Sequence, residues 1–161
     1  MDSLSPKARS LVMSRIHGKD TNPELAVRRI IKPMRLPCRF HDRLLPGCPD
    51  IVFPSQQKVI LIHGCFWHRH RCRKGRSLPK TRSAFWKRKL ECNRLRDRRC
   101  RRALSRKGWH VLVVWECQLR NVPGLVGKIA EFLGRTPRGK TRKPARRDPK
   151  RPTTSDLTQT R

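Results

Sequence analysis

The chain has 161 residues, enough for one domain with a tail, and it carries 41 Lys and Arg residues against 11 Asp and Glu residues. A compact protein with a formal net charge of +30 repels itself unless a polyanion relieves the charge. The sequence has no apolar run of the ~18 residues that a membrane span needs, and its first residues lack the apolar core of a signal peptide. We therefore expect a cytoplasmic protein that binds nucleic acid and not membranes.

The N-terminal part of the chain predicts an arm followed by a helix. Residues 1–20 are mostly basic and polar, as expected of an arm or a short helix. A helix start follows, with Thr21 as N-cap, Pro23 in the first turn and Glu24 closing a capping box. Apolar residues then recur along the helix until Pro33, which bounds it.

The rest of the chain alternates between strands and helices. Three strands are expected, over 50–53, 58–62 and 109–115, and the apolar run 58–62 is typical of a central strand covered on both faces. Two helices are expected, a basic one over 83–107 that ends at Gly108 and a short one over 123–133. This order predicts an α/β domain with a mixed sheet over residues 1–133. Residues 134–161, rich in Pro, Lys and Arg, are predicted to be disordered.

A segment rich in cysteine and histidine follows the predicted central strand. Cys65, His70 and Cys72 can supply three soft ligands to a zinc ion. Cys117 is the best fourth ligand if the strands 58–62 and 109–115 are neighbours that end at the same edge. Because such a shell has no open position, the zinc would be structural. The alternative is a set of reduced, buried cysteines with no metal, because an odd number of cysteines without an export signal argues against disulfides.

A second, harder metal site is predicted where two strands meet. Asp50 opens one strand and His63 ends the next, so Asp50, the carbonyl region of Ile62 and His68 could come together. A carboxylate, a main-chain carbonyl and waters suit Mg²⁺, and a neutral histidine could take a proton from the attacking water. From the sequence alone, Asp50 is more often a turn residue and Glu24 is already explained by its capping box.

Aromatic and basic residues form a third group. Phe66 and Trp67 lie within the Cys/His segment, while Trp86, Lys89 and Asn93 share one face of the predicted basic helix. Exposed aromatic rings in a basic setting stack on bases or insert between base steps. Core packing is the simpler interpretation of Trp86.

Taken together, these residues resemble the very short patch repair (Vsr-type) DNA mismatch endonucleases, a branch of the restriction-endonuclease-like fold. The resemblance extends from about Met13 to Arg120. It rests on the blocks at 13–16, 19–24, 45–53, 63–68, 85–89 and 108–117.

The resemblance implies a role for each residue at a matching position. Asp50 and the Ile62 carbonyl would bind catalytic Mg²⁺, His68 would be the general base, and His63 and Glu24 would hold metal-bound waters. The structural Zn²⁺ ligands would be Cys65, His70, Cys72 and Cys117. DNA contacts near the mismatch would come from Met13, Phe66, Trp67, Trp86, Lys89 and Asn93.

The resemblance also implies an activity and a setting. The enzyme would nick double-stranded DNA 5′ to the thymine of a T·G mismatch, as a monomer in the bacterial cytoplasm at the nucleoid, with mismatch-repair proteins as further partners. Arg35 stands where relatives usually have a helix-ending Gly, and Cys48 where they usually have Arg, Lys or Thr.

Two other functions fit part of the same pattern. A zinc-stabilised DNA-binding module without catalysis would share the composition, the Cys/His segment and the basic tail; Asp50, His63 and His68 argue against it. A nuclease of the same fold that cuts matched or modified DNA would share all of these features.

Overall fold

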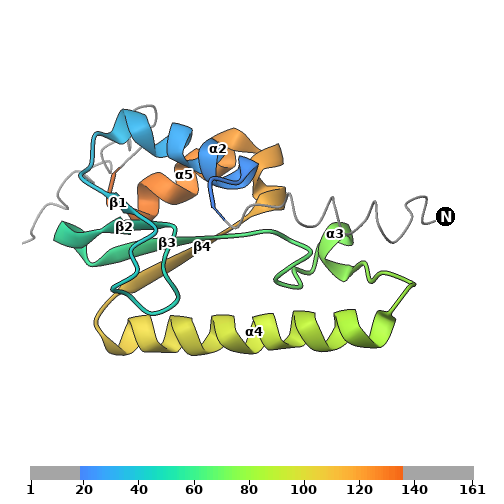
Figure 1. Cartoon of the computed structure of the whole chain (residues 1–161). Helices are drawn as coiled ribbons and strands as arrows, with labels where there is room; N and C mark the ends of the chain where they lie inside the picture. Colours follow the sequence, from blue (N-terminus) through green and yellow to red (C-terminus); the bar gives the residue numbers. More distant parts are fainter. Residues whose placement is uncertain (1–18, 136–161) are drawn as a thin grey trace, which may run out of the picture.

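The computed structural model describes residues 19–135, which form a mixed α/β fold in three layers (Figure 1). Met13, the rest of residues 1–18 and residues 136–161 of the expected tail lie outside the described residues. The elements are α2 Asn22–Ile31, a 3₁₀ turn Lys32–Met34, β1 Arg39–Phe40, β2 Ile51–Phe53, a 3₁₀ turn Pro54–Gln56, β3 Lys58–His63, α3 Arg73–Arg76, α4 Ser83–Arg106, β4 His110–Trp115, a 3₁₀ turn Glu116–Arg120 and α5 Val122–Phe132. The sequence did not predict β1 or α3. None of the described helices is long and apolar enough to cross a membrane.

The sheet is mixed, as predicted, with strand order β1-β2-β3-β4. β3 is antiparallel to β2, with Ile51 opposite Ile60, and parallel to β4, with His63 opposite Trp115. Residues 59–63 of β3 are all buried, so the prediction of a central strand covered on both faces is confirmed. The segment 109–115, expected as another core strand, is instead at the edge of the sheet, and Val114 is its only fully buried strand residue.

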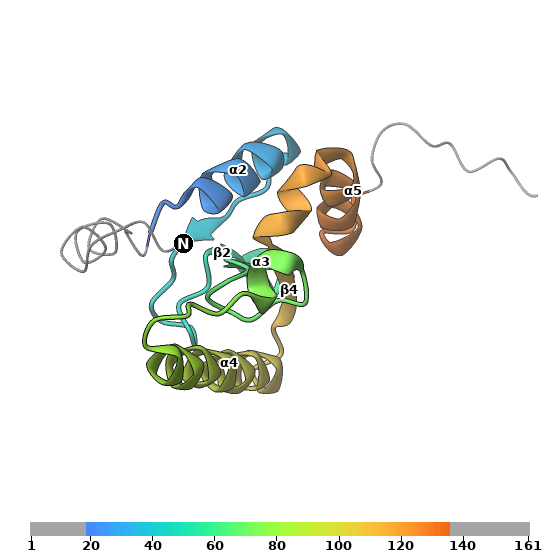
Figure 2. The same ribbon diagram turned by 90° about the vertical axis from the view of Figure 1, so that its right-hand side faces the viewer.

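Two apolar layers cover the sheet, α2 and α5 on one face and α4 on the other (Figure 2). The alternation of side chains along β2 and β3 sends Ile51 and Ile60 towards α2 and α5, and Val52 and Val59 towards Leu104 of α4. The helix α4 also connects β3 to β4, which is the crossover that a parallel strand pair requires.

Two helix ends show how the sequence sets the chain path. Gly108 adopts a φ of +79°, and the N–H groups of Gly108 and Trp109 donate to Ser105 and Leu104, which closes α4 as predicted. Arg35 adopts a φ of +50° just after the turn that ends α2, a conformation that glycine reaches more easily.

The capping box predicted at Thr21 is only partly correct. The Thr21 hydroxyl donates to the Glu24 carboxylate instead of accepting a backbone N–H, and that carboxylate accepts the N–H of Asp20. The helix start is therefore tied by the Glu24 side chain, which is buried.

Candidate active site and metal centre

Asp50 is held at the start of β2 by the neighbouring strand. Its Oδ2 accepts the N–H of Ile62 at 2.6 Å, while its carbonyl accepts the N–H of His41 at 3.2 Å. Burial raises the pKa of the Asp50 carboxyl to about 6, and the hydrogen bond from Ile62 only partly offsets this effect. A cation beside Asp50 would therefore strongly favour its ionised form.

The strand register of Ile62 makes its carbonyl a candidate second oxygen ligand. In an antiparallel pair, the N–H and C=O of one residue point towards the same neighbouring strand. The N–H of Ile62 points to Asp50, so its carbonyl faces that side too. The pairing of Ile51 with Ile60 places Pro49 opposite Ile62, and proline has no N–H to donate. The ladder thus supplies no donor there, and the carbonyl stays available.

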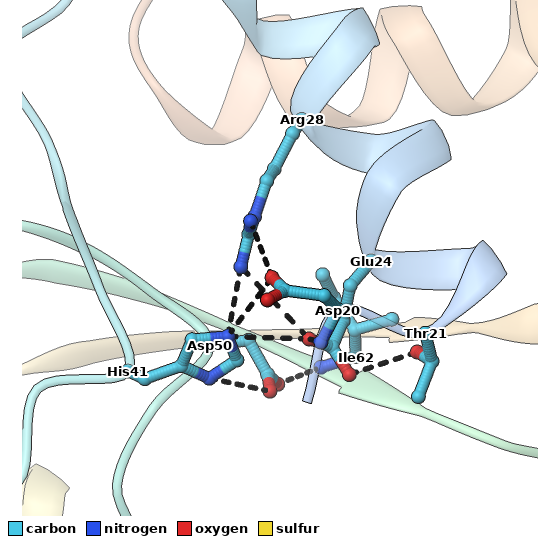
Figure 3. A network of polar contacts seen from close by, with 7 residues as sticks. All are labelled: Asp20, Thr21, Glu24, Arg28, His41, Asp50 and Ile62. Atoms are coloured by element: carbon cyan, nitrogen blue, oxygen red, sulfur yellow. Dashed lines mark hydrogen bonds and ion pairs between the residues drawn. The ribbon is translucent and has the colours of Figure 1, made fainter. Parts of the chain in front are cut away.

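Glu24 joins Asp50 through a polar network that the sequence did not predict (Figure 3). The Glu24 Oε2 lies 3.3 Å from Nε2 of His41, and Nδ1 of His41 lies 4.0 Å from Oδ1 of Asp50. Arg28 donates to Nε2 of His41 at 2.7 Å and pairs with Asp20 at 2.6 Å. His41 therefore lies between the two carboxylates.

The sequence missed His41 because strand β1 is only two residues long. The pairing of Arg39 with Val52 places residue 41 opposite Asp50, so a prediction of β1 would have found it. Without that pairing, His41 is an isolated histidine before a turn.

His68 is oriented by Asp97 of α4, a second residue that sequence reasoning missed. Nδ1 of His68 lies 2.5 Å from Oδ2 of Asp97, and the His68 ring stacks on His63 with centroids 3.9 Å apart. This contact leaves Nε2, at the opposite corner of the ring, for a proton from water. Asp97 extends the predicted helix face of Trp86 and Asn93 by one further turn, which was the available signal.

The electrostatics of this histidine pair favour one neutral ring and one ionised carboxylate. Burial and the neighbouring His68 lower the pKa of His63, so His63 is neutral at physiological pH. Burial alone would raise the pKa of Asp97, but the hydrogen bond and the charge of His68 outweigh it and keep the pKa below its usual value. Glu24, His41, Asp50, His63, His68 and Asp97 all line one pocket.

The four predicted zinc ligands converge at a separate place, beyond the ends of β3 and β4. The ligand atoms of Cys65, His70, Cys72 and Cys117 all lie within 4.8 Å of one another. Nδ1 of His70 is 3.9 Å from Sγ of Cys65 and 3.5 Å from Sγ of Cys117, close to the about 3.6 Å that separates sulfur and nitrogen on a tetrahedral zinc. All seven cysteines are free thiols, so this cluster could hold a metal.

The thiols of the cluster have unlike electrostatic environments. Burial raises the pKa of Cys65 to about 12, whereas the hydrogen bond with His70 lowers the pKa of Cys72 to about 6. A metal would bind all three sulfurs as thiolates.

Two residues outside the ligand set fix the Cys/His segment. Glu116 accepts the N–H of Cys65 at 3.2 Å and pairs with Lys74 at 2.5 Å. A Cβ at Gly75 would stand 2.2 Å from the carbonyl oxygen of His70, so only glycine allows α3 to pack there. Sequence reasoning missed Glu116, which reaches the Cys/His segment only because β4 lies next to β3.

The predicted aromatic residues gather at the N-terminal end of α4. Ring centroids of Phe66 and Trp67 lie 5.7 and 6.0 Å from that of Trp86, and all three rings are half-buried. Lys89 is exposed, with its ammonium 5.7 Å from the Trp86 ring. The amide of Asn93 donates to the Trp67 carbonyl at 3.3 Å, so Asn93 supports the aromatic segment from within.

A half-buried carboxylate that shares a pocket with a histidine oriented by a second carboxylate is an arrangement that could hydrolyse a phosphodiester with the help of a metal ion. Comparison with known proteins agrees with this class. The family model of DNA mismatch endonuclease Vsr matches residues 1–74. The type II nicking enzyme V.XorIIP of Xanthomonas oryzae pv. oryzae is 46% identical over 132 residues, which cover 82% of this chain and 96% of that protein.

Two further relatives extend the same pattern. The type II nicking enzyme V.NmeAIP of Neisseria meningitidis is 41% identical over 120 residues, covering 74% of this chain and 85% of that protein. The DNA mismatch endonuclease Vsr of Escherichia coli is 43% identical over 112 residues, covering 70% of this chain and 71% of that protein. The chain belongs to the Vsr family. It is a DNA endonuclease, a hydrolase of phosphodiester bonds.

Proposed function

We propose that this endonuclease nicks one strand of duplex DNA 5′ to the thymine of a T·G mismatch and so initiates very short patch repair. The main support for this function is the pocket that Asp50 shares with the hydrogen-bonded pair of His68 and Asp97. The name of the Escherichia coli relative supports mismatched DNA as the substrate. Residues 1–133, in a restriction-endonuclease-like fold, would carry out this reaction.

We further propose Mg²⁺ as the catalytic ion and Zn²⁺ as the structural ion. Asp50 and the Ile62 carbonyl supply the hard oxygen ligands that Mg²⁺ prefers, and Glu24 and His63 would hold its waters. When bound, Mg²⁺ supplies charge stabilisation to the phosphoryl oxygens. The zinc ligands are the Cys65, His70, Cys72 and Cys117 cluster, and they leave no open position for chemistry.

The chain's own residues perform the proton transfer in this mechanism. Nε2 of His68 takes a proton from the attacking water, and Asp97 holds the ring in the tautomer that leaves Nε2 unprotonated. The resulting imidazolium is stabilised by the Asp97 carboxylate. His63 is neutral and stacked on His68, so it limits the rotation of the His68 ring without adding a positive charge.

Selection of the mismatch is assigned to the aromatic cluster. Phe66, Trp67 and Trp86 would enter the duplex beside the mismatch, with Lys89, Asn93 and Met13 nearby. Prying apart base steps costs a few kcal/mol and is least costly beside a poorly stacked pair. A T·G wobble therefore lowers the cost of insertion relative to a matched site.

One nicking assay tests this function. The protein is incubated with a duplex that carries a single T·G mismatch in a CT(A/T)G-like context, and with the matched T·A duplex, in Mg²⁺ or in EDTA. We expect a Mg²⁺-dependent nick confined to the mismatch, in the strand that carries its thymine. Equal cleavage of both duplexes would favour a nuclease for matched DNA, and no cleavage would favour a binding module. Asp50→Ala should remove nicking and retain binding.

The basic tail beyond Leu133 is proposed to add sequence-independent affinity. Truncation after Leu133 should reduce the salt dependence of binding, because each phosphate neutralised on duplex DNA adds about 0.9 to the log–log slope. An unchanged slope would show that the tail does not touch DNA.

A further inference from the structure

The helix α4 has two unlike faces. Leu90 and Leu104 are buried against the sheet, and Asn93 and Asp97 on the same side line the catalytic pocket. Residues two positions from a buried one point about 200° away around a helix. The side of α4 that faces away from the sheet carries Arg88, Arg98, Arg99, Arg102 and Arg106, all exposed, and this set is here called the outer face.

The outer face is open within the part of the chain that the structure describes. In both views α4 forms an outside layer, and no described helix or strand lies on its far side (Figures 1 and 2). Glu91 is the acidic residue on that side, and it pairs with Arg94 at 3.8 Å, a cation outside this set. Among described residues, no carboxylate forms an ion pair with any of the five outer-face arginines.

The length and the residue type of this face indicate its partner. Arg88 and Arg106 are 18 positions apart, which is about 27 Å along the helix or roughly eight base pairs of duplex. All five cations are arginines, whose planar fork binds phosphate oxygens bidentately. Leu95 is also exposed on this side of α4, between the arginines. A broad stripe of arginines with little acidic charge fits a phosphate backbone better than it fits an acidic protein of irregular shape.

A duplex in the catalytic pocket leaves this face unused. The pocket side of α4 presents Asn93 and Asp97, and Arg102 and Arg106 point to the opposite side of a helix about 10–12 Å thick. DNA that reaches the outer face is therefore a second segment. We propose that the outer face of α4 is a second, sequence-independent binding site for duplex DNA. It would let the endonuclease hold one DNA segment in the pocket while it contacts another, and so pass directly between segments.

The test uses the full-length protein and two labelled duplexes. A donor-labelled mismatched duplex occupies the pocket in buffer without Mg²⁺, which prevents cleavage and leaves the zinc in place, and an acceptor-labelled matched duplex of about 20 base pairs is then added. We expect energy transfer between the two duplexes at equimolar protein. We also expect the release rate of the first duplex to rise with the concentration of the second.

A variant and a matched control localise the effect. Arg99→Gln, Arg102→Gln and Arg106→Gln together remove three outer-face charges and keep residues that favour a helix. Arg29→Gln, Lys32→Gln and Arg35→Gln remove three exposed charges from the layer of α2, on the other side of the sheet. The outer-face variant should lose at least tenfold in affinity for the second duplex, with a salt slope lower by up to about 2.7, while the control variant retains both.

Several outcomes would overturn the proposal. They are the absence of a ternary complex with the unaltered protein, equal losses in both variants, and retention of the second duplex by the outer-face variant. Tighter binding of duplex RNA than of duplex DNA at this face would also overturn it. Nicking of a short mismatched duplex should stay unchanged in the outer-face variant, so loss of T·G specificity in the assay above is a separate result.

Discussion

The Cys/His cluster and the pocket that contains Asp50 and His68 lie at the same end of the sheet, yet their polar groups are arranged in opposite ways. In the cluster, Cys65, His70 and Cys117 contact mainly one another, so a bound ion would find every position filled by the protein. In the pocket, Asp50 is held by a backbone N–H and His68 by Asp97, each through one side only. The cluster would therefore leave a bound ion no free position, whereas the pocket leaves one side of each group free for water or a phosphate.

The strongest test of this contrast removes the group that orients His68. Asp97→Asn should lower the single-turnover nicking rate about 10²–10³-fold, because the amide no longer fixes the tautomer or stabilises the imidazolium. Affinity for the mismatched duplex should change less than about twofold, since Asp97 makes no DNA contact in this mechanism. Glu91→Gln changes the other carboxylate of α4, which is exposed, and serves as the control. Equal rates for Asp97→Asn and the unaltered protein would remove Asp97 from the mechanism.

The corresponding test of the cluster acts on stability. Cys117→Ser should lower the free energy of unfolding by about 3–5 kcal/mol and abolish stoichiometric zinc, because metal binding contributes directly to folding. Metal content by mass spectrometry and urea unfolding with and without a chelator measure both effects. Cys92→Ser, on the exposed surface of α4, should alter neither. If Cys117→Ser retained one zinc per chain, the proposed ligand set would be wrong.

The ionised Asp50 carboxylate should lower the free energy of unfolding of the metal-free protein. Folding raises the pKa of Asp50 from 3.8 to about 6, so the folded state binds the proton more tightly than the unfolded state does. The ionised carboxylate therefore opposes folding, and stability without metal falls as the pH rises from 3.8 through about 6.

The Asn substitution at this position tests that sign. Without added Mg²⁺, Asp50→Asn should raise the free energy of unfolding by ~1–2 kcal/mol at pH 8, less than the full shift in pKa implies because the side chain is partly exposed. The gain should be small at pH 4, where the folded carboxyl is already protonated. Thermal unfolding at the two pH values measures the difference. Added Mg²⁺ should stabilise only the unaltered protein. A variant less stable than the parent at pH 8 would contradict this account.

The smallest effect is expected at Glu116, which braces the cluster from outside. Burial alone would raise the pKa of this carboxyl, but the bonds from Lys74 and from the Cys65 N–H outweigh it and lower the pKa. The stability that it contributes is present above the unfolded pKa and is lost as the pH falls through the folded one.

Removing the Glu116 carboxylate should therefore lower the free energy of unfolding by an amount that depends on pH. Glu116→Gln should cost about 0.5–1 kcal/mol at pH 7, and the cost should shrink towards pH 4. Urea unfolding at both pH values measures it, with Glu131→Gln on the exposed side of α5 as the control. A cost that grows on acidification would refute this role.

The sequence predicted most elements because their local signals agree with the packing. The apolar run 58–62 forms the central strand β3, and the basic helix α4 ends at Arg106, one residue before its predicted limit. It missed β1, which is two residues long and has both residues exposed, so no alternation could reveal it. The edge position of β4 was missed because apolar content does not distinguish an edge strand from a central one.

The same division applies to the two candidate sites. The sequence alone predicted that Asp50 lies beside Ile62 and that Cys65, His70, Cys72 and Cys117 come together, because these residues lie at or just beyond the ends of adjacent strands. Only the tertiary structure brought Asp97 to His68, across 29 positions, and His41 between Glu24 and Asp50. Those contacts depend on how α4 and β1 pack against the sheet. No local pattern of residues specifies that packing.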